Sequence, residues 1–320
     1  MPQKNIFRVI FKNIKKIVAN FMSGIFPPGF HGASLYEILS LFFSYARKPI
    51  FNLYAGALSF NFFLALFPAI IFLFTLVAYI PIPNLKEGIL ETLNFFLPQS
   101  SFSTINDSIT DIVKNQRSGL LSVGFISALY FASNGVHNMM SAFDSSLETE
   151  IKKKRNFLQK RITSIFITLL VTLLLLLSIV VLIIGGYISA NLSKWGMNES
   201  LVNAGLFIIE TLTLTSLVFY TISFIYHYAP SSISKWRLIS PGSIVATTLS
   251  LISTYAFTSY VNHFNLYNKV YGSIGAIIAM MLLIYVNVYS ILIGFELNHS
   301  INKVANEKSK HVKKQNTFEN

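Results

Sequence analysis

The chain of 320 residues is 53% hydrophobic and only 12% charged, about half the charged fraction of a soluble domain, and its mean hydropathy is +0.57. This composition excludes a soluble enzyme and a disordered chain. No cysteine is present, which excludes disulfides, thiolate nucleophiles and cysteine-ligated metal centres. The net charge of +12 is consistent with binding to nucleic acid, with binding to anionic lipid, or with the orientation of a membrane protein. The position of the charges along the chain must decide among these interpretations.

The N-terminal segment, residues 1–48, is predicted to be cytoplasmic and to contain a basic amphipathic helix. An apolar stripe with helical spacing is accompanied by lysines elsewhere on the turn; its members are Ile6, Ile10, Ile14, Ile17 and Phe21. The stripe fits either the anionic inner leaflet of a membrane or the protein's own helical bundle, and both alternatives stay open. No secretory signal peptide is predicted, because Pro27, Pro28 and Gly29 interrupt the chain before an apolar region forms.

Six windows that lack Lys and Arg predict six membrane-spanning helices within residues 49–299, an all-α polytopic membrane bundle. A bilayer core of about 30 Å requires about 20 mostly apolar residues in helical conformation. Pro68 predicts a kink in the first window. The windows are Phe51–Ile80, Gly119–Phe143, Ile162–Ala190, Leu201–Ala229, Ile239–Phe264 and Val270–Asn298.

The connection from Pro81 to Ser118 is too long for a bare loop. Its apolar residues recur at helical spacing on both sides of Pro98, so we expect two short amphipathic helices on the outer face. They could cover the mouth of a cavity or form an interfacial rim. The apolar positions are Leu85, Ile89, Leu93 and Leu97, then Ile105, Ile109, Ile112 and Val113.

The basic residues alternate from loop to loop. Twenty of the 25 Lys and Arg lie before the first window, between residues 144 and 161, between residues 230 and 238, and after Asn298. The positive-inside rule therefore places both termini in the cytoplasm. The charge excess indicates orientation rather than a nucleic-acid partner. Residues 300–320 are expected to be a mobile cytoplasmic tail.

Polar side chains within the windows are the candidate functional residues, because polar groups are costly in hydrocarbon. Ser133, Asn134, His137 and Asn138 share one helical face through spacings of three and four residues. They fit either hydrogen bonds between helices or a substrate contact. Glu210 and Glu296 are the acidic residues of the windows, and both fit either a polar path or contacts within the bundle. For Glu296, at the inner end of its helix, the structural alternative is a pairing with Lys or Arg of an inner loop.

Small residues recur at four-residue spacing and predict close contacts between helices. The sixth window carries two such pairs and is therefore expected to be central to the bundle. The pairs are Gly124 and Ala128, Gly185 and Ser189, Gly186 and Ala190, Gly272 and Ala276, and Gly275 and Ala279.

Catalytic motifs are missing from the sequence. It contains no H-E-x-x-H, no G-x-x-x-x-G-K-[ST] and no G-x-S-x-G, and its three aspartates lie outside the windows. We expect no catalytic residue, no metal site and no cofactor, and so no enzyme. Lys152, Lys153, Lys154 and Arg155 could form a phosphate-binding patch, but contact with phosphate alone is not catalysis.

Motifs in the last two windows resemble the YihY/BrkB family of bacterial inner-membrane proteins. The motif residues are Pro241, Gly242, Tyr260, Tyr267, Asn268, Tyr271, Gly272, Ser273, Ile274, Gly275, Ala276, Gly294, Phe295, Glu296, Leu297 and Asn298. The resemblance implies six spans with both ends cytoplasmic. Members have carried a ribonuclease BN label, and some are associated with virulence or envelope lipid export. Asp144 and Asn287 depart from the family pattern, which usually has Asn and an apolar residue there.

The sequence favours a transporter or flippase for a lipid, amphiphile or small solute, with the polar face of the second window lining the path. The alternative is a non-catalytic scaffold or envelope assembly or virulence factor, since no Lys or Arg is buried in the windows. A membrane enzyme is the least favoured hypothesis. The expected partners are membrane lipids of the anionic inner leaflet; a homo-oligomer is left open, and no nucleic acid is expected.

Overall fold

The computed structural model describes residues 21, 23–27, 32, 34–46, 49–80, 109–147, 155–194, 199–231, 238–263 and 265–318. This part of the chain contains helices and no strand, which confirms the all-α prediction. The helices are α2 (Leu35–Ala46), α3 (Pro49–Val77), α6 (Ser118–Ser146), α7 (Phe157–Lys194), α8 (Glu199–Tyr228), α9 (Pro241–His263) and α10 (Asn265–Phe318).

Each of the six predicted spans coincides with one long helix. Five helices contain a segment long and apolar enough to cross a membrane: Ile50–Val77, Ser118–Ser146, Phe157–Ser178, Ala204–Tyr228 and Ile277–Lys308. The sixth, α9, has 23 residues and so a length of about 35 Å, which is sufficient for a span.

Helix α9 is less apolar than its neighbours because Ser and Thr recur along it. The hydroxyl of Thr247 donates to the carbonyl of Ser243 at 2.8 Å, and the hydroxyl of Thr248 donates to the carbonyl of Ile244 at 2.9 Å. Such bonds back to the preceding turn satisfy the hydroxyls inside the helix itself. The polar residues of α9 are therefore compatible with a membrane environment.

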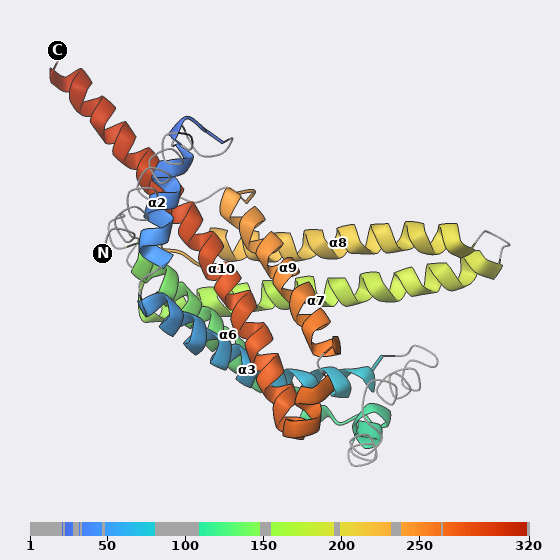
Figure 1. The fold of residues 1–320 in the computed structure, drawn as a ribbon. Helices are drawn as coiled ribbons and strands as arrows, with labels where there is room; N and C mark the ends of the chain where they lie inside the picture. The colour runs from blue at the N-terminus through green and yellow to red at the C-terminus, as the bar shows by residue number, and fades with distance from the viewer. Residues whose placement is uncertain are drawn as a thin grey trace, which may run out of the picture.

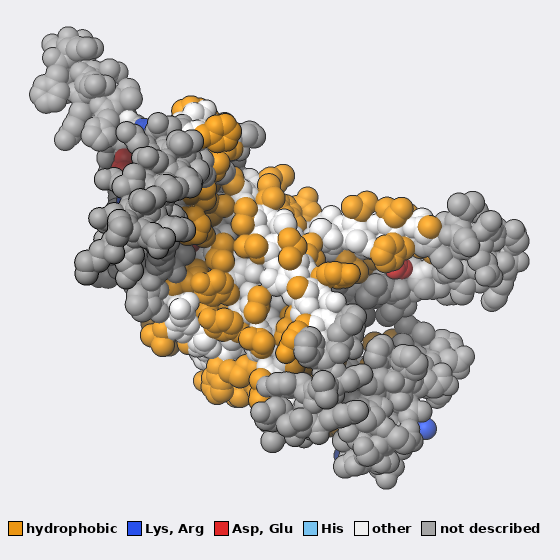
Figure 2. Space-filling model, viewed as in Figure 1, with side chains coloured by type: hydrophobic (Ala, Val, Ile, Leu, Met, Phe, Trp, Pro, Cys, Tyr) orange, Lys and Arg blue, Asp and Glu red, His pale blue; other side chains and the backbone are white. Residues whose placement is uncertain are grey.

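The helices form a body and a projecting hairpin (Figure 1). Helix α10 runs along the body and packs against α9, α3 and α2, while α6 packs against α3. Helices α7 and α8 form the antiparallel hairpin, which meets the body through α6 and α9. In the space-filling view, hydrophobic side chains are scattered over the visible face of the body, as expected of a surface that meets lipid (Figure 2).

The hydrophobic core lies at one end of the bundle. We call this the basic end, because the segments that carry twenty of the 25 Lys and Arg attach to it; the opposite end is the far end. All six long helices contribute to this core. Its buried members are Phe51, Ala55, Leu58, Val136, Met139, Met140, Ala142, Phe143, Leu147, Ile167, Ile222, Ile225, Tyr226, Ala229, Ala246, Val288, Leu292 and Phe295.

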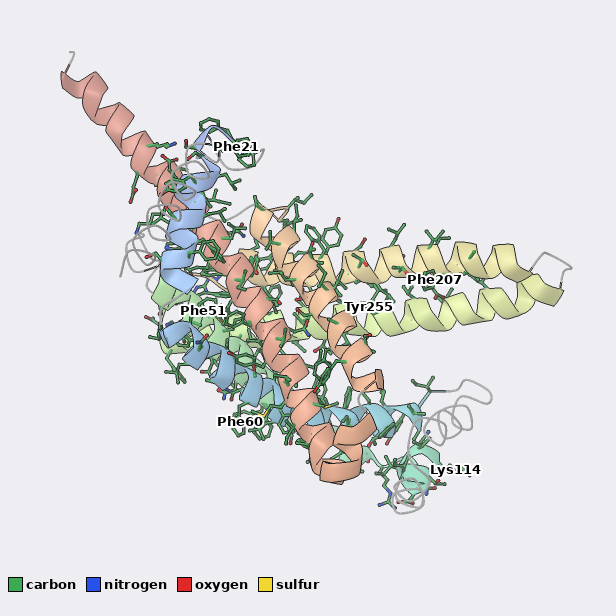
Figure 3. The ribbon with its side chains drawn as sticks, in the orientation of Figure 1. Phe21, Phe51, Phe60, Lys114, Phe207 and Tyr255 are labelled. Atoms are coloured by element: carbon green, nitrogen blue, oxygen red, sulfur yellow. The ribbon has the colours of Figure 1, made fainter. Side chains whose placement is uncertain are left out.

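Toward the far end the hairpin leaves the body. Along α8, Ile222 is 3% exposed in the core, whereas Phe207 and Leu212 are 69% and 63% exposed on the hairpin. Figure 3 labels Phe207 on this projecting part of α8. The helices thus converge at the basic end and diverge toward the far end.

Close helix contacts occur at some of the predicted small residues. A methyl group on Gly124 of α6 would lie 3.2 Å from the backbone nitrogen of Phe72 in α3. A methyl group on Gly185 of α7 would collide with the carboxylate of Glu210 in α8. Both glycines let neighbouring helices approach closely, as the spacing predicted. The side chains of residues 271–274 lie outside the described part.

The C-terminal segment, predicted to be a mobile cytoplasmic tail, is part of the last helix. Helix α10 continues without interruption to Phe318, so residues 300–318 are helical. Ile301 and Val304 are buried with Ile38 of α2. The physical reason is that apolar residues continue at helical spacing beyond Asn298 and pack against α2. The motion of this segment stays a prediction.

Two other predicted features lie mainly outside the described residues. The amphipathic stripe from Ile6 to Ile17 is one, and Leu85 to Ile105 of the long connection is the other. In the described remainder of that connection, residues 109–114 are helical and Val113 is buried.

Candidate functional site

The polar face of α6 lies where α6 meets α3 and α7. Asn134 donates through its amide to the side-chain oxygen of Asn61 in α3, at 3.3 Å. Ser133 is buried, and its hydroxyl donates to the carbonyl of Tyr130 in its own helix, at 3.0 Å. Asn134 therefore joins two helices, whereas the hydroxyl of Ser133 is hydrogen-bonded within its own helix.

His137 and Asn138 lie one turn nearer the basic end on the same face. Both are half-buried, and the ring of His137 lies 6.4 Å from that of Phe157, at the start of α7. Its Nδ1 atom has no hydrogen-bond partner in the part of the chain that the structure describes. Nearby, the guanidinium of Arg161 lies 5.1 Å from the centre of the Tyr130 ring. This corner combines an imidazole, a cation and aromatic rings.

Glu210 is apart from the polar face of α6. It is half-buried on α8, packed against Gly185 of α7, about 27 Å along the helix from the C-terminal end of α8. The structure therefore places Glu210 on the projecting hairpin and the α6 residues on the body. A carboxylate at this depth is costly and is a candidate for function.

The motif residues of α9 and α10 form a close helix crossing. A methyl group on Gly242 would collide with the carbonyl oxygen of Gly294, and one on Gly294 would collide with that of Gly242. The hydroxyl of Tyr226 in α8 donates to the carbonyl of Ile291, which brings a third helix to the same point. We call Gly242, Gly294, Asn298 and Tyr226 the glycine crossing.

Asn298 connects α10 to the start of α9. Its side-chain oxygen accepts from the backbone nitrogen of Gly242 at 2.7 Å, and its amide donates to the hydroxyl of Ser240 at 2.8 Å. The first backbone N–H groups of a helix lack partners within the helix. Asn298 therefore caps α9 from another helix, which gives the Pro241–Gly242 and Gly294–Asn298 motifs a shared structural role.

Two of the remaining predicted residues of α10 are buried. Glu296 is 1% exposed, and Gly275 is also buried. The pairing of Glu296 with a basic residue of an inner loop stays a prediction. Tyr271 and Gly272 lie within α10.

Sequence reasoning missed a set of bonds that holds the end of α8. The guanidinium of Arg155 donates to the carbonyls of Tyr228, Ala229 and Pro230 at 3.2, 2.9 and 3.1 Å. The carboxylate of Asp144 accepts from the backbone nitrogen of Ser231 at 2.9 Å.

These bonds assign Arg155 a role that the sequence left open. A cation at a helix C-terminus satisfies unpaired carbonyls and interacts favourably with the helix dipole. Arg155 is therefore a helix cap rather than part of a free phosphate patch. The predicted end of the fourth span was the available signal, since its carbonyls needed a donor, but no spacing rule joins residues 74 positions apart.

Asp144 and Asn287, the two departures from the family pattern, both have bonding roles. Besides Ser231, Asp144 faces the ammonium of Lys160 at 3.8 Å. The amide of Asn287 donates to the hydroxyl of Thr254 in α9 at 3.2 Å and to the carbonyl of Leu283 at 3.0 Å. Each therefore binds one segment of the chain to another.

The apolar helices and the buried interhelical bonds define a multi-pass helical membrane protein. The model of the family described as Virulence factor BrkB matches residues 42–318. The chain belongs to this family, as the sequence motifs indicated.

Two relatives illustrate the range of similarity. The chain is 30% identical to "Putative ribonuclease-like protein YfkH" of Bacillus subtilis over 225 residues, covering 70% of this chain and 80% of that protein. It is 31% identical to "UPF0761 membrane protein XAC0937" of Xanthomonas axonopodis over 83 residues, covering 26% of this chain and 20% of that protein. No solved structure matches the chain.

Proposed function

We propose that the protein is an inner-membrane transporter or flippase for a lipid or other amphiphile, and that its basic end faces the cytoplasm. The supporting observation is the packing difference between the two ends of the bundle. The helices are joined by a core at the basic end, while the hairpin diverges from the body toward the far end. A protein closed on one side and separated on the other fits one state of a transport cycle.

The polar residues give this proposal a route. Glu210 lies on the hairpin, and Asn134, His137 and Asn138 lie on the body near the point where the hairpin joins it. A polar headgroup moving between hairpin and body would pass from the first group to the second. Its acyl chains would stay in the surrounding lipid, which removes the need for an enclosed pore.

A scaffold is the second candidate, because several intramembrane polar residues are used to join helices. The Asn134–Asn61 and Asn287–Thr254 pairs both connect neighbouring helices. A static envelope-assembly factor requires such bonds and no route. In both cases we expect the protein not to be an enzyme, to contact anionic lipids of the inner leaflet, and to bind no nucleic acid; a homo-oligomer is left open.

Lipid movement in reconstituted vesicles distinguishes the two candidates. Vesicles containing the purified protein and a fluorescent phospholipid are treated with a membrane-impermeant quencher. The transporter proposal predicts faster loss of the inner-leaflet signal than in protein-free vesicles. It also predicts slower loss with Glu210→Gln and with His137→Ala.

Asn287→Ala is the matched control, because it removes an intramembrane amide between α9 and α10 and leaves the residues of the proposed route unchanged. Its rate should equal that of the wild type. A rate no faster than protein-free vesicles, or equal rates in wild type, Glu210→Gln and His137→Ala, would contradict the lipid route and favour the scaffold.

A further inference from the structure

A shallow groove lies on the surface between α3 and α10, away from the hairpin. It has a volume of about 150 Å³ and is lined by Asn52, Tyr285, Val286 and Tyr289. We call these residues the α3–α10 groove. Asn52 belongs to the first turn of α3, so the groove is at the basic end of the spans.

The two tyrosine rings of the groove are held in place by the core. Tyr289 meets Phe51 edge to face, with ring centres 5.2 Å apart and planes at 88°. Tyr285 stacks on Tyr289 with centres 6.0 Å apart. Phe51, labelled in Figure 3, is itself a buried core residue. The rings are therefore fixed before any ligand arrives, which lowers the entropic cost of binding.

The polar groups of the groove have no partner in the described part of the chain. No hydrogen bond there involves the side-chain amide of Asn52 or the hydroxyls of Tyr285 and Tyr289. Asn52 is exposed and both tyrosines are half-buried, so these polar groups are accessible to a ligand. A ligand that supplies oxygen acceptors would satisfy them, whereas acyl chains would not.

The location indicates which ligand this is. The first turn of a span lies where acyl chains meet headgroups, and there the available acceptors are ester and phosphate oxygens.

We propose that the α3–α10 groove binds one phospholipid through its ester and phosphate oxygens. The side chains of Asn52, Tyr285 and Tyr289 donate to these oxygens, and the acyl chains follow the apolar surface of α3 and α10. The site is separate from the proposed route, so it can hold a lipid whether or not the protein moves lipids.

Native mass spectrometry of the purified protein tests this site. Delipidated protein in detergent is given phosphatidylglycerol or a diacylglycerol with the same acyl chains, and bound lipid is counted. We expect one retained phosphatidylglycerol and about tenfold weaker retention in the Tyr285→Phe/Tyr289→Phe variant, which loses two hydrogen bonds but keeps both rings. Diacylglycerol should be retained poorly by both.

Tyr255→Phe is the control, because Tyr255 is 79% exposed on α9 and lies outside the groove (Figure 3). It should retain phosphatidylglycerol as the wild type does. Unfolding temperatures measured without lipid should be the same in all three proteins, which separates lost binding from lost folding. Equal retention by the double variant, or equal retention of diacylglycerol by the wild type, would overturn the proposal.

Discussion

The two ends of the bundle use different means to hold helices together. At the basic end, aromatic and aliphatic side chains of six helices form one core, and Phe143 stacks on Phe295 with ring centres 3.8 Å apart. On the hairpin near the far end, α7 and α8 contact each other, and Phe207 and Leu212 are exposed. Lipid tails are as apolar as these side chains, so no hydrophobic force closes the hairpin onto the body. Close packing and polar bonds must fix the arrangement, and the core shared by all six long helices lies at the basic end.

The largest predicted effect comes from filling the glycine crossing. Gly294→Leu would place a side chain against the carbonyl of Gly242 and the hydroxyl of Tyr226, and should lower the free energy of unfolding by about 3 kcal/mol through overpacking. Thermal unfolding in detergent measures this. The control is Gly205→Leu on α8, where an added Cβ would meet no atom within 4 Å. Similar stabilities for the two variants would show that α9 and α10 do not approach closely at Gly242 and Gly294.

The next effect concerns the cap on α8. Arg155→Ala leaves the carbonyls of Tyr228, Ala229 and Pro230 without their donor and should destabilise the protein by about 2 kcal/mol. Arg155→Lys should recover only part of this, because an ammonium lacks the planar fork of a guanidinium. Denaturant unfolding gives both values.

Arg117→Ala is the comparison at the far end, since Arg117 pairs with Asp111 while 53% exposed. Exposed pairs contribute about 1 kcal/mol or less. An equal or larger loss at Arg117 than at Arg155 would show that the far end, not the basic end, stabilises the bundle.

A smaller effect is expected at the bond between α3 and α6. Asn134→Ala and Asn61→Ala should each cost about 1 kcal/mol, and the double variant should cost little more than either single one. A double-mutant cycle of unfolding free energies measures this coupling. Fully additive losses would mean that the two amides do not interact.

The smallest effect is a pH dependence at the contact of α2 with α10. The Lys308 ammonium, at 2.9 Å, and the backbone N–H of Ser34 lower the pKa of Glu37 below its ordinary value. The ionised carboxylate therefore stabilises this contact above the ordinary pKa, and the stabilisation is lost as the pH falls through the lowered pKa. Because both side chains are 43% exposed, the effect should be modest.

A spin label on Phe43→Cys in α2 reports this contact. Its mobility should increase between about pH 6 and pH 3 in the otherwise wild-type chain. With Glu37→Gln added, mobility should be high at both pH values. Glu307→Gln, next to Lys308, should keep the wild-type response. A pH response that survives Glu37→Gln would assign the effect to another group.

The sequence was sufficient for the spans because their hydrophobicity and length are set by the bilayer itself. It also located the motif glycines and Asn298, although the spacing could not show that they meet at one crossing. It was insufficient for Arg155, which the sequence groups with the preceding lysines as a phosphate-binding patch, although it caps a helix end 74 residues away. Patterns within one helix report which face is buried, whereas bonds between helices depend on how those helices pack.

The candidate site shows the same limit. Spacing placed Asn134 and His137 on one face, and the structure identifies Asn61 as the partner of Asn134. The position of Glu210 on the projecting hairpin, apart from the polar face of α6, could not be predicted, because nothing within its own window shows that α7 and α8 leave the body. The divergence of the hairpin arises from contacts that are concentrated near one end.

A cysteine scan of α8 tests the difference between the two ends most directly, since the chain has no cysteine of its own. Spin labels are placed singly at positions 207, 208, 209 and 212 on the hairpin and at positions 222 and 226 in the core, in protein reconstituted into lipid. Collisions with oxygen dissolved in the bilayer measure lipid exposure. We predict high exposure at all four hairpin positions, which lie on several sides of the helix, and protection at both core positions. Protection at any of the four hairpin positions equal to that at position 222 would show that the hairpin packs against the body and would contradict this account.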